Sequence, residues 1–427
     1  MTAQCRPSVL APFRVRNFRI QWPSDLLTSC AFEMEALILG WYVLVETGSV
    51  LLLSLFGALL YVGTLMAPFF GVVGDRIGHR NLLCAMRGFY TALAAVLLAV
   101  AFAAALNPLV VFCIAGLMGL VRSSDLGVRG ALVAHTVAAE QLVGALGISR
   151  TTSDAARVMG ALAGAGLFAG FGIVAAYVAV TGLYALGLLL VLAMDRPGGA
   201  RIASAGSAAE ANGTRLPETR PSHWRDLAEG LMLVWSTPAL LACMLLAVLV
   251  NLFAFPLSIQ LLPYVAREVY GVDETGLGCL VASFAVGALL GSVAVSVRRG
   301  SAPGRTMIVA CVAWFVCLLA FVQMQTLWTG AAALALAGFA QSLCLVTLAV
   351  LVLGIAGERF GGRIMGVRML AIYGLPLGVL LGGALIDAIG FRAMGTLYAL
   401  IGIALTLGIA LLWRADLWRA SLAENAR

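Results

Sequence analysis

Three ionisable residues stand inside long apolar stretches, where a charge is costly and is a functional candidate by default. Glu33 and Glu35 lie in the first stretch and Arg122 lies in the fourth. A carboxylate at that depth can bind and release a proton, and a nearby guanidinium favours its charged form. These three residues are therefore candidates for proton coupling. The alternative is a structural ion pair, or a glutamate beside a wet vestibule.

The depth of each group follows from the helical rise of 1.5 Å per residue. Counted from Val45, Glu33 lies roughly 18 Å and Glu35 roughly 15 Å along the helix. Counted from Leu109, Arg122 lies roughly 20 Å along its own helix. Similar depths would allow a first-helix carboxylate to meet Arg122. The two glutamates are about 200° apart around the helix, so they cannot both face one cavity.

Four more charged residues form two helical pairs near the ends of the fourth and fifth stretches. Asp125 precedes Arg129 by four residues, and Asp154 precedes Arg157 by three. Such spacings place opposite charges side by side on a helix. We expect these four residues to form a cytosolic charge network with Asp75, rather than a substrate site.

Polar groups are sparse in the second half of the chain. Asn251 and Gln341 lie far enough into apolar stretches to be substrate-cavity candidates, with hydrogen bonding between helices as the alternative role. The nine cysteines include no Cys-x-x-Cys pair, and the three histidines lie far apart. No phosphate-binding loop or catalytic triad is present. We therefore expect no enzyme activity, no metal and no cofactor.

The composition predicts the elements that must hold these groups. Of the 427 residues, 62% are hydrophobic and 11% are charged, whereas soluble domains carry about 25% charged residues. Such a surface must face lipid, and stretches of roughly 20 apolar residues predict helices that span it. The predicted spans are 24–45, 49–70, 82–105, 109–130, 146–169, 173–194, 238–262, 275–297, 306–324, 329–352, 366–388 and 394–413.

One long polar segment divides the spans into two equal groups. Residues 195–230 are rich in Gly, Ser and Pro, which is typical of a flexible linker. The prediction is an all-α membrane protein with about twelve transmembrane helices. Residues 1–194 would form an N-terminal six-helix bundle, residues 195–230 a cytoplasmic linker, and residues 231–427 a C-terminal six-helix bundle.

The arginines predict the orientation. All 27 basic residues are arginines, and with both termini in the cytoplasm all but Arg267 and Arg392 fall on the cytoplasmic side. This distribution fits the rule that cytoplasmic loops carry the positive charge. It accounts for the net charge of +7 without nucleic-acid binding.

Glycines and charges cluster in the loop between the second and third spans. The segment Gly71-Val72-Val73-Gly74-Asp75-Arg76-Ile77-Gly78-His79-Arg80 joins two closely spaced helices. Glycine permits a tight turn, and Asp75 can pair with an arginine or with a helix N-terminus. A contact of this kind could form in one conformation and break in another, as a latch formed by Gly71, Asp75, Arg76, Gly78 and Arg80. The alternative is a charged turn that only sets topology.

The same segment resembles the loop signature of the major facilitator superfamily, Gly-x-x-x-Asp-Arg-x-Gly-Arg-Arg/Lys. His79 replaces a usual basic residue. The resemblance to the superfamily extends over nearly the whole chain. Within the superfamily, the sequence is similar to the bacterial exporter branch of siderophore, macrolide and multidrug permeases. The resemblance includes residues 125–170, 251–256, 262–263, 362–366 and 374–378.

The resemblance implies the two-bundle fold and a secondary active transporter that works by alternating access. It implies proton-coupled efflux of small amphipathic compounds by a monomer in the bacterial inner membrane. Multidrug exporters of the family use a first-helix acid and a fourth-helix arginine, which here are Glu33 or Glu35 and Arg122. In the fifth predicted span, Ala161 follows Gly160, whereas the exporter pattern has proline after the corresponding glycine. The alternatives are an importer or uniporter on the same scaffold, and a membrane scaffold or sensor that transports nothing.

Overall fold

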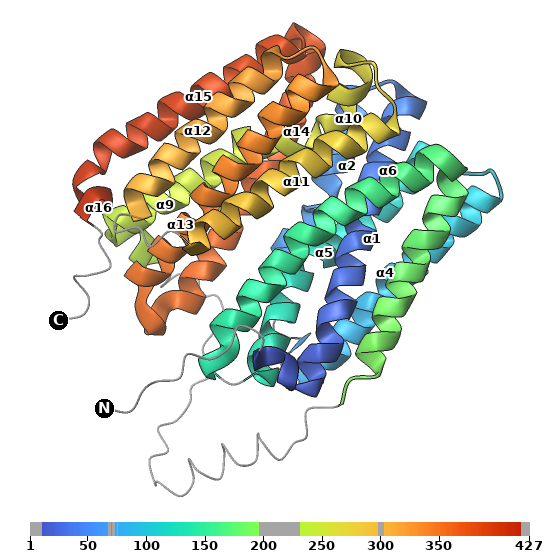
Figure 1. Cartoon of the computed structure of the whole chain (residues 1–427), viewed down its shortest axis with the longest axis horizontal. Coiled ribbons are helices and arrows are strands. Elements are labelled where there is room, and N and C mark those ends of the chain that lie inside the picture. The colour runs from blue at the N-terminus through green and yellow to red at the C-terminus, as the bar shows by residue number, and fades with distance from the viewer. Residues whose placement is uncertain are drawn as a thin grey trace, which may run out of the picture.

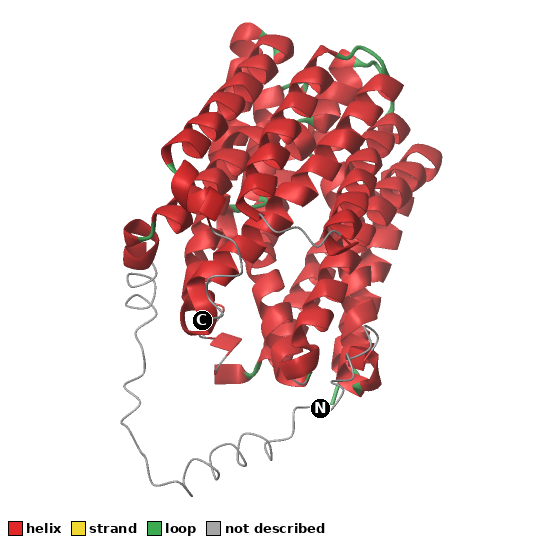
Figure 2. Cartoon of the chain, turned by 60° about the vertical axis from the view of Figure 1, so that its left-hand side comes forward, coloured by secondary structure: helices red, strands yellow, loops and turns green. Residues whose placement is uncertain are grey.

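The computed structural model describes residues 11–66, 70, 73–74, 76–137, 139–195, 231–297 and 303–419. Within these residues every regular element is a helix, and short loops join the helices (Figure 2). Gly71, Asp75 and nearly all of the expected linker lie outside the described residues. The assignment of 195–230 as a linker therefore stays a prediction.

The described residues of the first half form five long or medium helices. They are α1 (Arg16–Thr47), α2 (Val50–Leu59), α4 (His79–Phe102), α5 (Pro108–Thr136) and α6 (Ala139–Leu192), with 3-10 turns at Ala11–Arg14 and Val62–Met66. The backbone of α6 breaks at Gly172, whose φ of 76° is open to glycine without strain. The two limbs of α6 are the predicted fifth and sixth spans.

The second half repeats the pattern. Its α-helices are α9 (Pro238–Leu249), α10 (Leu262–Tyr264), α11 (Glu274–Val297), α12 (Pro303–Gln323), α13 (Leu327–Leu370), α14 (Gly374–Ile389), α15 (Phe391–Leu412) and α16 (Arg414–Arg419). Wider π-helical turns connect α9 to α10 and continue beyond it, at Val250–Ala254, Pro256–Gln260 and Val265–Val269. Pro256 lacks an N–H and cannot donate to the helix. In the π-helical turn that begins there, the Leu261 N–H donates to the Pro256 carbonyl five residues earlier, at 3.0 Å.

Most long helices of the described residues have membrane-spanning length. Ten of them are long and apolar enough to cross a bilayer, whereas the apolar helix Val50–Thr64 is shorter. One of the ten is α6, and because its backbone turns back at Gly172 its two limbs are two spans. The predicted all-α membrane fold is confirmed. The boundaries differ most at α13, which continues to Leu370 where the predicted span ends at residue 352. The helix α2 ends at Leu59 rather than at residue 70, and α1 begins at Arg16 rather than at residue 24.

The helices form two groups, α1 to α6 and α9 to α16 (Figure 1). We call the end of the molecule where α1 begins and α15 ends the terminal side, and the opposite end the far side. Across the groups, α6 packs on α11, α2 on α14, and α1 on α10 and α11.

The two groups meet close to the far side. The Arg267 guanidinium donates a hydrogen bond to the Leu44 carbonyl at 2.7 Å, near the end of α1. A methyl group on Gly278 of α11 would overlap the Ala165 side chain of α6. The far side is therefore closed by direct contact between the groups.

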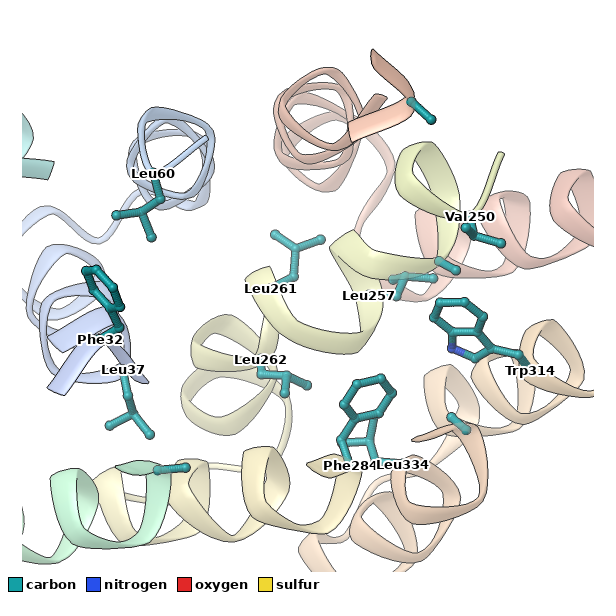
Figure 3. Close-up of a cluster of buried hydrophobic side chains, with 14 of the residues drawn as sticks. Phe32, Leu37, Leu60, Val250, Leu257, Leu261, Leu262, Phe284, Trp314 and Leu334 are labelled. Carbon is teal, nitrogen blue, oxygen red and sulfur yellow. The ribbon is translucent and has the colours of Figure 1, made fainter. Parts of the chain in front are cut away.

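The apolar core runs through both groups. Figure 3 shows Phe32, Leu37 and Leu60 from the first group near Leu261 and Leu262 of the second. Trp314 of α12 is fully buried, and its indole N–H donates to the Ser258 hydroxyl at 3.2 Å.

Candidate functional site

A cavity of about 420 Å³ lies in the first group of helices and contains most of the predicted charged residues. Its walls come from α1, α5, the segment after α2 with Tyr61 and Thr64, and the first limb of α6, while Ile372 comes from the second group. The cavity extends from Glu33 toward Asp25 and Arg150, which lie nearer the terminal side.

Glu33 faces this cavity and forms an ion pair with Arg157, with 3.6 Å between Oε1 and Nε. Both side chains are 20% exposed, so the pair is reachable from the cavity. Gly160 positions it, because a Cβ there would lie 2.9 Å from the Glu33 Cβ. Glu33 also lines a second cavity of about 50 Å³ between the two groups, beside Gln260 and Pro263.

Glu35 points the other way, as its spacing from Glu33 predicts. It is 4% exposed and accepts hydrogen bonds from the Tyr184 hydroxyl at 2.8 Å and the Tyr177 hydroxyl at 3.4 Å. Both tyrosines come from the second limb of α6. Of the two glutamates, Glu33 is the one that lines the large cavity.

Arg122 also lines the large cavity, but its neighbours are aromatic. Its guanidinium carbon lies 5.1 Å from the Phe32 ring centre and 5.9 Å from the Tyr61 ring centre, within the range of cation–π attraction. Among the described residues, no carboxylate forms an ion pair with Arg122. The ion pair that similar depths would allow with a first-helix glutamate is absent from this conformation, in which Glu33 pairs with Arg157 and Glu35 accepts from Tyr177 and Tyr184. Glu35 and Arg122 nevertheless line one small cavity of about 10 Å³.

Asp125 and Arg129 form the helical pair expected from their spacing. They belong to a buried four-residue cluster, which we call the inner quartet: Asp25, Arg87, Asp125 and Arg129. Arg87 is fully buried and donates to Asp25 at 2.8 Å and to Asp125 at 3.0 Å. Arg129 also pairs with Asp25, at 3.4 Å. Two acids and two bases balance the charge.

Asp154 and Arg157 also form their expected pair, at 3.8 Å, and Arg150 lies 3.5 Å from Asp154. This second cluster extends to Glu33 rather than to the inner quartet. The described contacts thus form two separate clusters in place of the single network expected from the sequence. Asp75, the expected link, lies outside the described residues.

The described part of the loop motif acts within the first group. Arg80 donates to the Met194 carbonyl at 2.9 Å and to the Leu192 carbonyl at 2.7 Å, which caps the end of α6. Gly78 adopts a φ of 86° just before α4, and Arg76 is exposed. The latch function of the motif stays a prediction.

The two cavity candidates of the second half stand apart from this site. The Asn251 amide donates to the Ala247 carbonyl at 2.8 Å, and Gln341 is 2% exposed. Neither belongs to the lining of the large cavity. Gln260 is the amide that reaches the first group, where it donates to the Tyr61 hydroxyl at 3.3 Å.

Sequence reasoning missed Asp25 and Arg87 as members of the site. Both stand next to predicted cytoplasmic flanks, where charge is ordinary. The available signal was periodicity: Leu83, Arg87, Tyr90 and Ala94 follow the helical repeat of one buried face. No comparable sequence pattern indicated that Tyr177 and Tyr184 would lie beside Glu35.

Comparison with known families accords with this architecture. The family model of the Major Facilitator Superfamily matches residues 25–370. The chain therefore belongs to the major facilitator superfamily, a family of membrane transporters. Comparison with curated proteins finds no match.

Solved structures show the same fold at low sequence identity. A POT family transporter bound to a thioalcohol-conjugated peptide has a TM-score of 0.70 and 13% identity, over 94% of this chain and 96% of that one. A D-xylose–proton symporter has a TM-score of 0.62 and 14% identity, over 90% and 96%. An inward-facing, unoccupied bacterial homologue of the human lysosomal transporter Spinster has a TM-score of 0.65 and 13% identity, over 95% and 97%.

Proposed function

We propose that this protein is a proton-coupled secondary transporter that exports a small amphipathic molecule by alternating access, as a monomer. The observation that carries the proposal is the Glu33–Arg157 pair at the junction of the two cavities. Glu33 thus lines the large cavity and also borders the space between the two groups of helices.

The ion pair between Glu33 and Arg157 supports a role in proton exchange. The pair holds α1 to the first limb of α6 while the Glu33 carboxylate is charged. A proton that binds Glu33 removes the pair and leaves Arg157 to Asp154 alone. The protonated and charged states therefore hold α1 and α6 together differently, which lets proton binding bias one conformation over the other.

The arginine distribution supports the proposed direction of opening. We place the terminal side in the cytoplasm and the protein in a bacterial inner membrane, because nearly all arginines then lie on the cytoplasmic side. The present conformation, closed at the far side, is then the one that loads from the cytoplasm. The aromatic wall formed by Phe32 and Tyr61 suits molecules with an apolar body.

Proteoliposomes with an imposed pH gradient and enclosed pyranine test this proposal. The probes are naphthalene-1-sulfonate, naphthalene-1-sulfonamide and trimethyl-1-naphthylammonium, which carry no proton of their own across the membrane at neutral pH. We expect at least one probe to elicit proton flux, and Glu33→Gln to abolish that flux while preserving exchange of the probe down its gradient.

Other outcomes identify the alternatives. Probe transport that ignores the gradient in the wild type and in Glu33→Gln and Glu35→Gln would indicate a uniporter. Gradient-driven movement of probe and protons in the same direction would indicate an importer. A protein that moves none of the three would favour a membrane scaffold.

A further inference from the structure

The charge balance of the large cavity is uneven. Four arginines and three carboxylates line it: Arg122, Arg129, Arg150, Arg157, Asp25, Glu33 and Asp125. The side chains of the inner quartet neutralise one another, and Arg157 binds Glu33 and Asp154. Arg150 lies beside Asp154.

Arg122 is the lining arginine whose described contacts include no carboxylate. Two aromatic rings flank its guanidinium, and the rings offer only the weaker attraction of their π faces. The charges of Glu33 and Glu35 act on Arg122 from beyond ion-pair distance. A partly buried cation with no anion in direct contact is an unfavourable arrangement in a protein interior. An anion that enters the cavity would relieve it.

The geometry around Arg122 also describes the rest of the ligand. A guanidinium presents a planar fork of donors that fits the two oxygens of a carboxylate, sulfonate or phosphate group. Phe32 and Tyr61 lie beside that fork and present flat apolar surface. Ile372 of the second group adds an apolar contact at the wall of the cavity.

We propose that the cavity takes an amphipathic anion, whose acidic head binds Arg122 and whose aromatic or apolar body lies against Phe32 and Tyr61. The inference rests on the proposed transport function and specifies its substrate class. It assigns Arg122 to substrate binding, whereas Glu33 and Arg157 remain the proton-coupling pair.

Binding to the purified full-length protein in nanodiscs tests the inference by calorimetry. Naphthalene-1-sulfonate and naphthalene-1-sulfonamide share one ring system and differ in charge. We expect the wild type to bind the sulfonate at least about 10-fold more tightly, the scale of a charge-assisted hydrogen bond. Arg122→Gln should reduce that preference to about 2-fold or less, and Arg122→Lys should retain part of it.

A matched control is Arg392→Gln, an exposed arginine at the start of α15, which should keep the full preference. A wild type that binds the sulfonate no better than the sulfonamide, or binds neither, overturns the inference without any variant. An Arg122→Gln protein with an intact gel-filtration profile and an undiminished preference overturns it as well.

The binding and transport experiments can each refute one proposal without refuting the other. A sulfonate preference lost in Arg122→Gln, combined with transport that ignores the pH gradient, would keep the anion site and refute proton coupling. Gradient-driven transport without any preference for the anion would keep the proposed function and refute the anion site.

Discussion

The hydroxyl of Tyr61 accepts a hydrogen bond from the Gln260 amide at 3.3 Å, while its ring lies 5.9 Å from the guanidinium of Arg122. One side chain thus contacts the opposite group of helices and the large cavity together. Any movement of Tyr61 that accompanies ligand binding at Arg122 would act on a bond between the two groups. This arrangement offers a direct physical route from cavity occupancy to the closure of the far side.

Removing that hydroxyl should loosen the far side. We predict that Tyr61→Phe increases the alkylation rate of a cysteine placed at Ala36, which lines the small cavity between the groups, by about 2- to 10-fold. The measurement uses an impermeant maleimide on the far side of sealed vesicles, in a background without native cysteines. Tyr42→Phe is the control, since Tyr42 donates to the Leu106 carbonyl within the first group. Equal rates for both variants would contradict the prediction.

Added bulk between α6 and α11 should have a larger effect. Gly278 leaves no room for a side chain against Ala165, so Gly278→Val must separate the helices at the far side. We predict that alkylation at the Ala36 position rises by about 5-fold or more, within the usual range of conformational coupling. Gly166→Val on α6 has open space around it and should leave the rate unchanged.

The inner quartet should make a large contribution to stability through its charge balance. Arg87→Met leaves Asp25 and Asp125 buried with Arg129 as their remaining described arginine partner, and we predict a loss of about 3–5 kcal/mol in the free energy of unfolding. Chemical unfolding in detergent micelles provides the measurement. Combining Arg87→Met with Asp25→Asn restores neutrality and should recover more than half of the loss. A double variant as unstable as the single one would show that packing, rather than charge, is responsible.

The buried carboxylate of Glu35 should depend mainly on one tyrosine. Tyr184→Phe removes the 2.8 Å hydrogen bond, and we predict a loss of about 1–3 kcal/mol in the free energy of unfolding. Tyr177→Phe removes the longer bond of 3.4 Å and should cost less. The same chemical unfolding assay compares the two variants, and a larger loss for Tyr177→Phe would refute the ranking.

Arg80 should hold the end of α6 in place. Arg80→Gln removes its bonds to the Leu192 and Met194 carbonyls, and we predict that amide exchange across residues 189–195 becomes about 2- to 5-fold faster. Hydrogen exchange with mass spectrometry resolves this segment. Arg76→Gln alters the neighbouring exposed arginine of the same motif and should leave the segment unaffected.

Apolar length and polar breaks were enough to predict the helices. Asn107-Pro108 and Gly172 stand where the chain turns, and hydropathy alone located the stretches between them. The π-helical turns around Pro256 could not be predicted, because they depend on how the chain repacks around a missing N–H. The start of α1 was also missed, since Phe18 is buried against Val133 and Ala145 of other helices, a tertiary contact that no local pattern reports.

The candidate site was predictable in composition but not in pairing. The depths predicted from helix geometry placed Glu33 and Arg122 at similar positions across the membrane, and both residues line the large cavity. Depth does not define rotation about the helix axis relative to a neighbour, so it could not show that Glu33 would pair with Arg157 of α6. Arg87 escaped notice for a related reason: position near a helix end does not reveal burial when three helices converge there.

The loops of the far side are short. Gly172 alone reverses α6, Gly390 alone separates α14 from α15, and the other far-side connections are two to five residues long. Such turns leave almost no polypeptide standing clear of the lipid surface. An antibody fragment or nanobody raised against the folded protein would therefore find few protruding epitopes there, and a fiducial for electron microscopy is better attached at the terminal side, where α16 follows the last span.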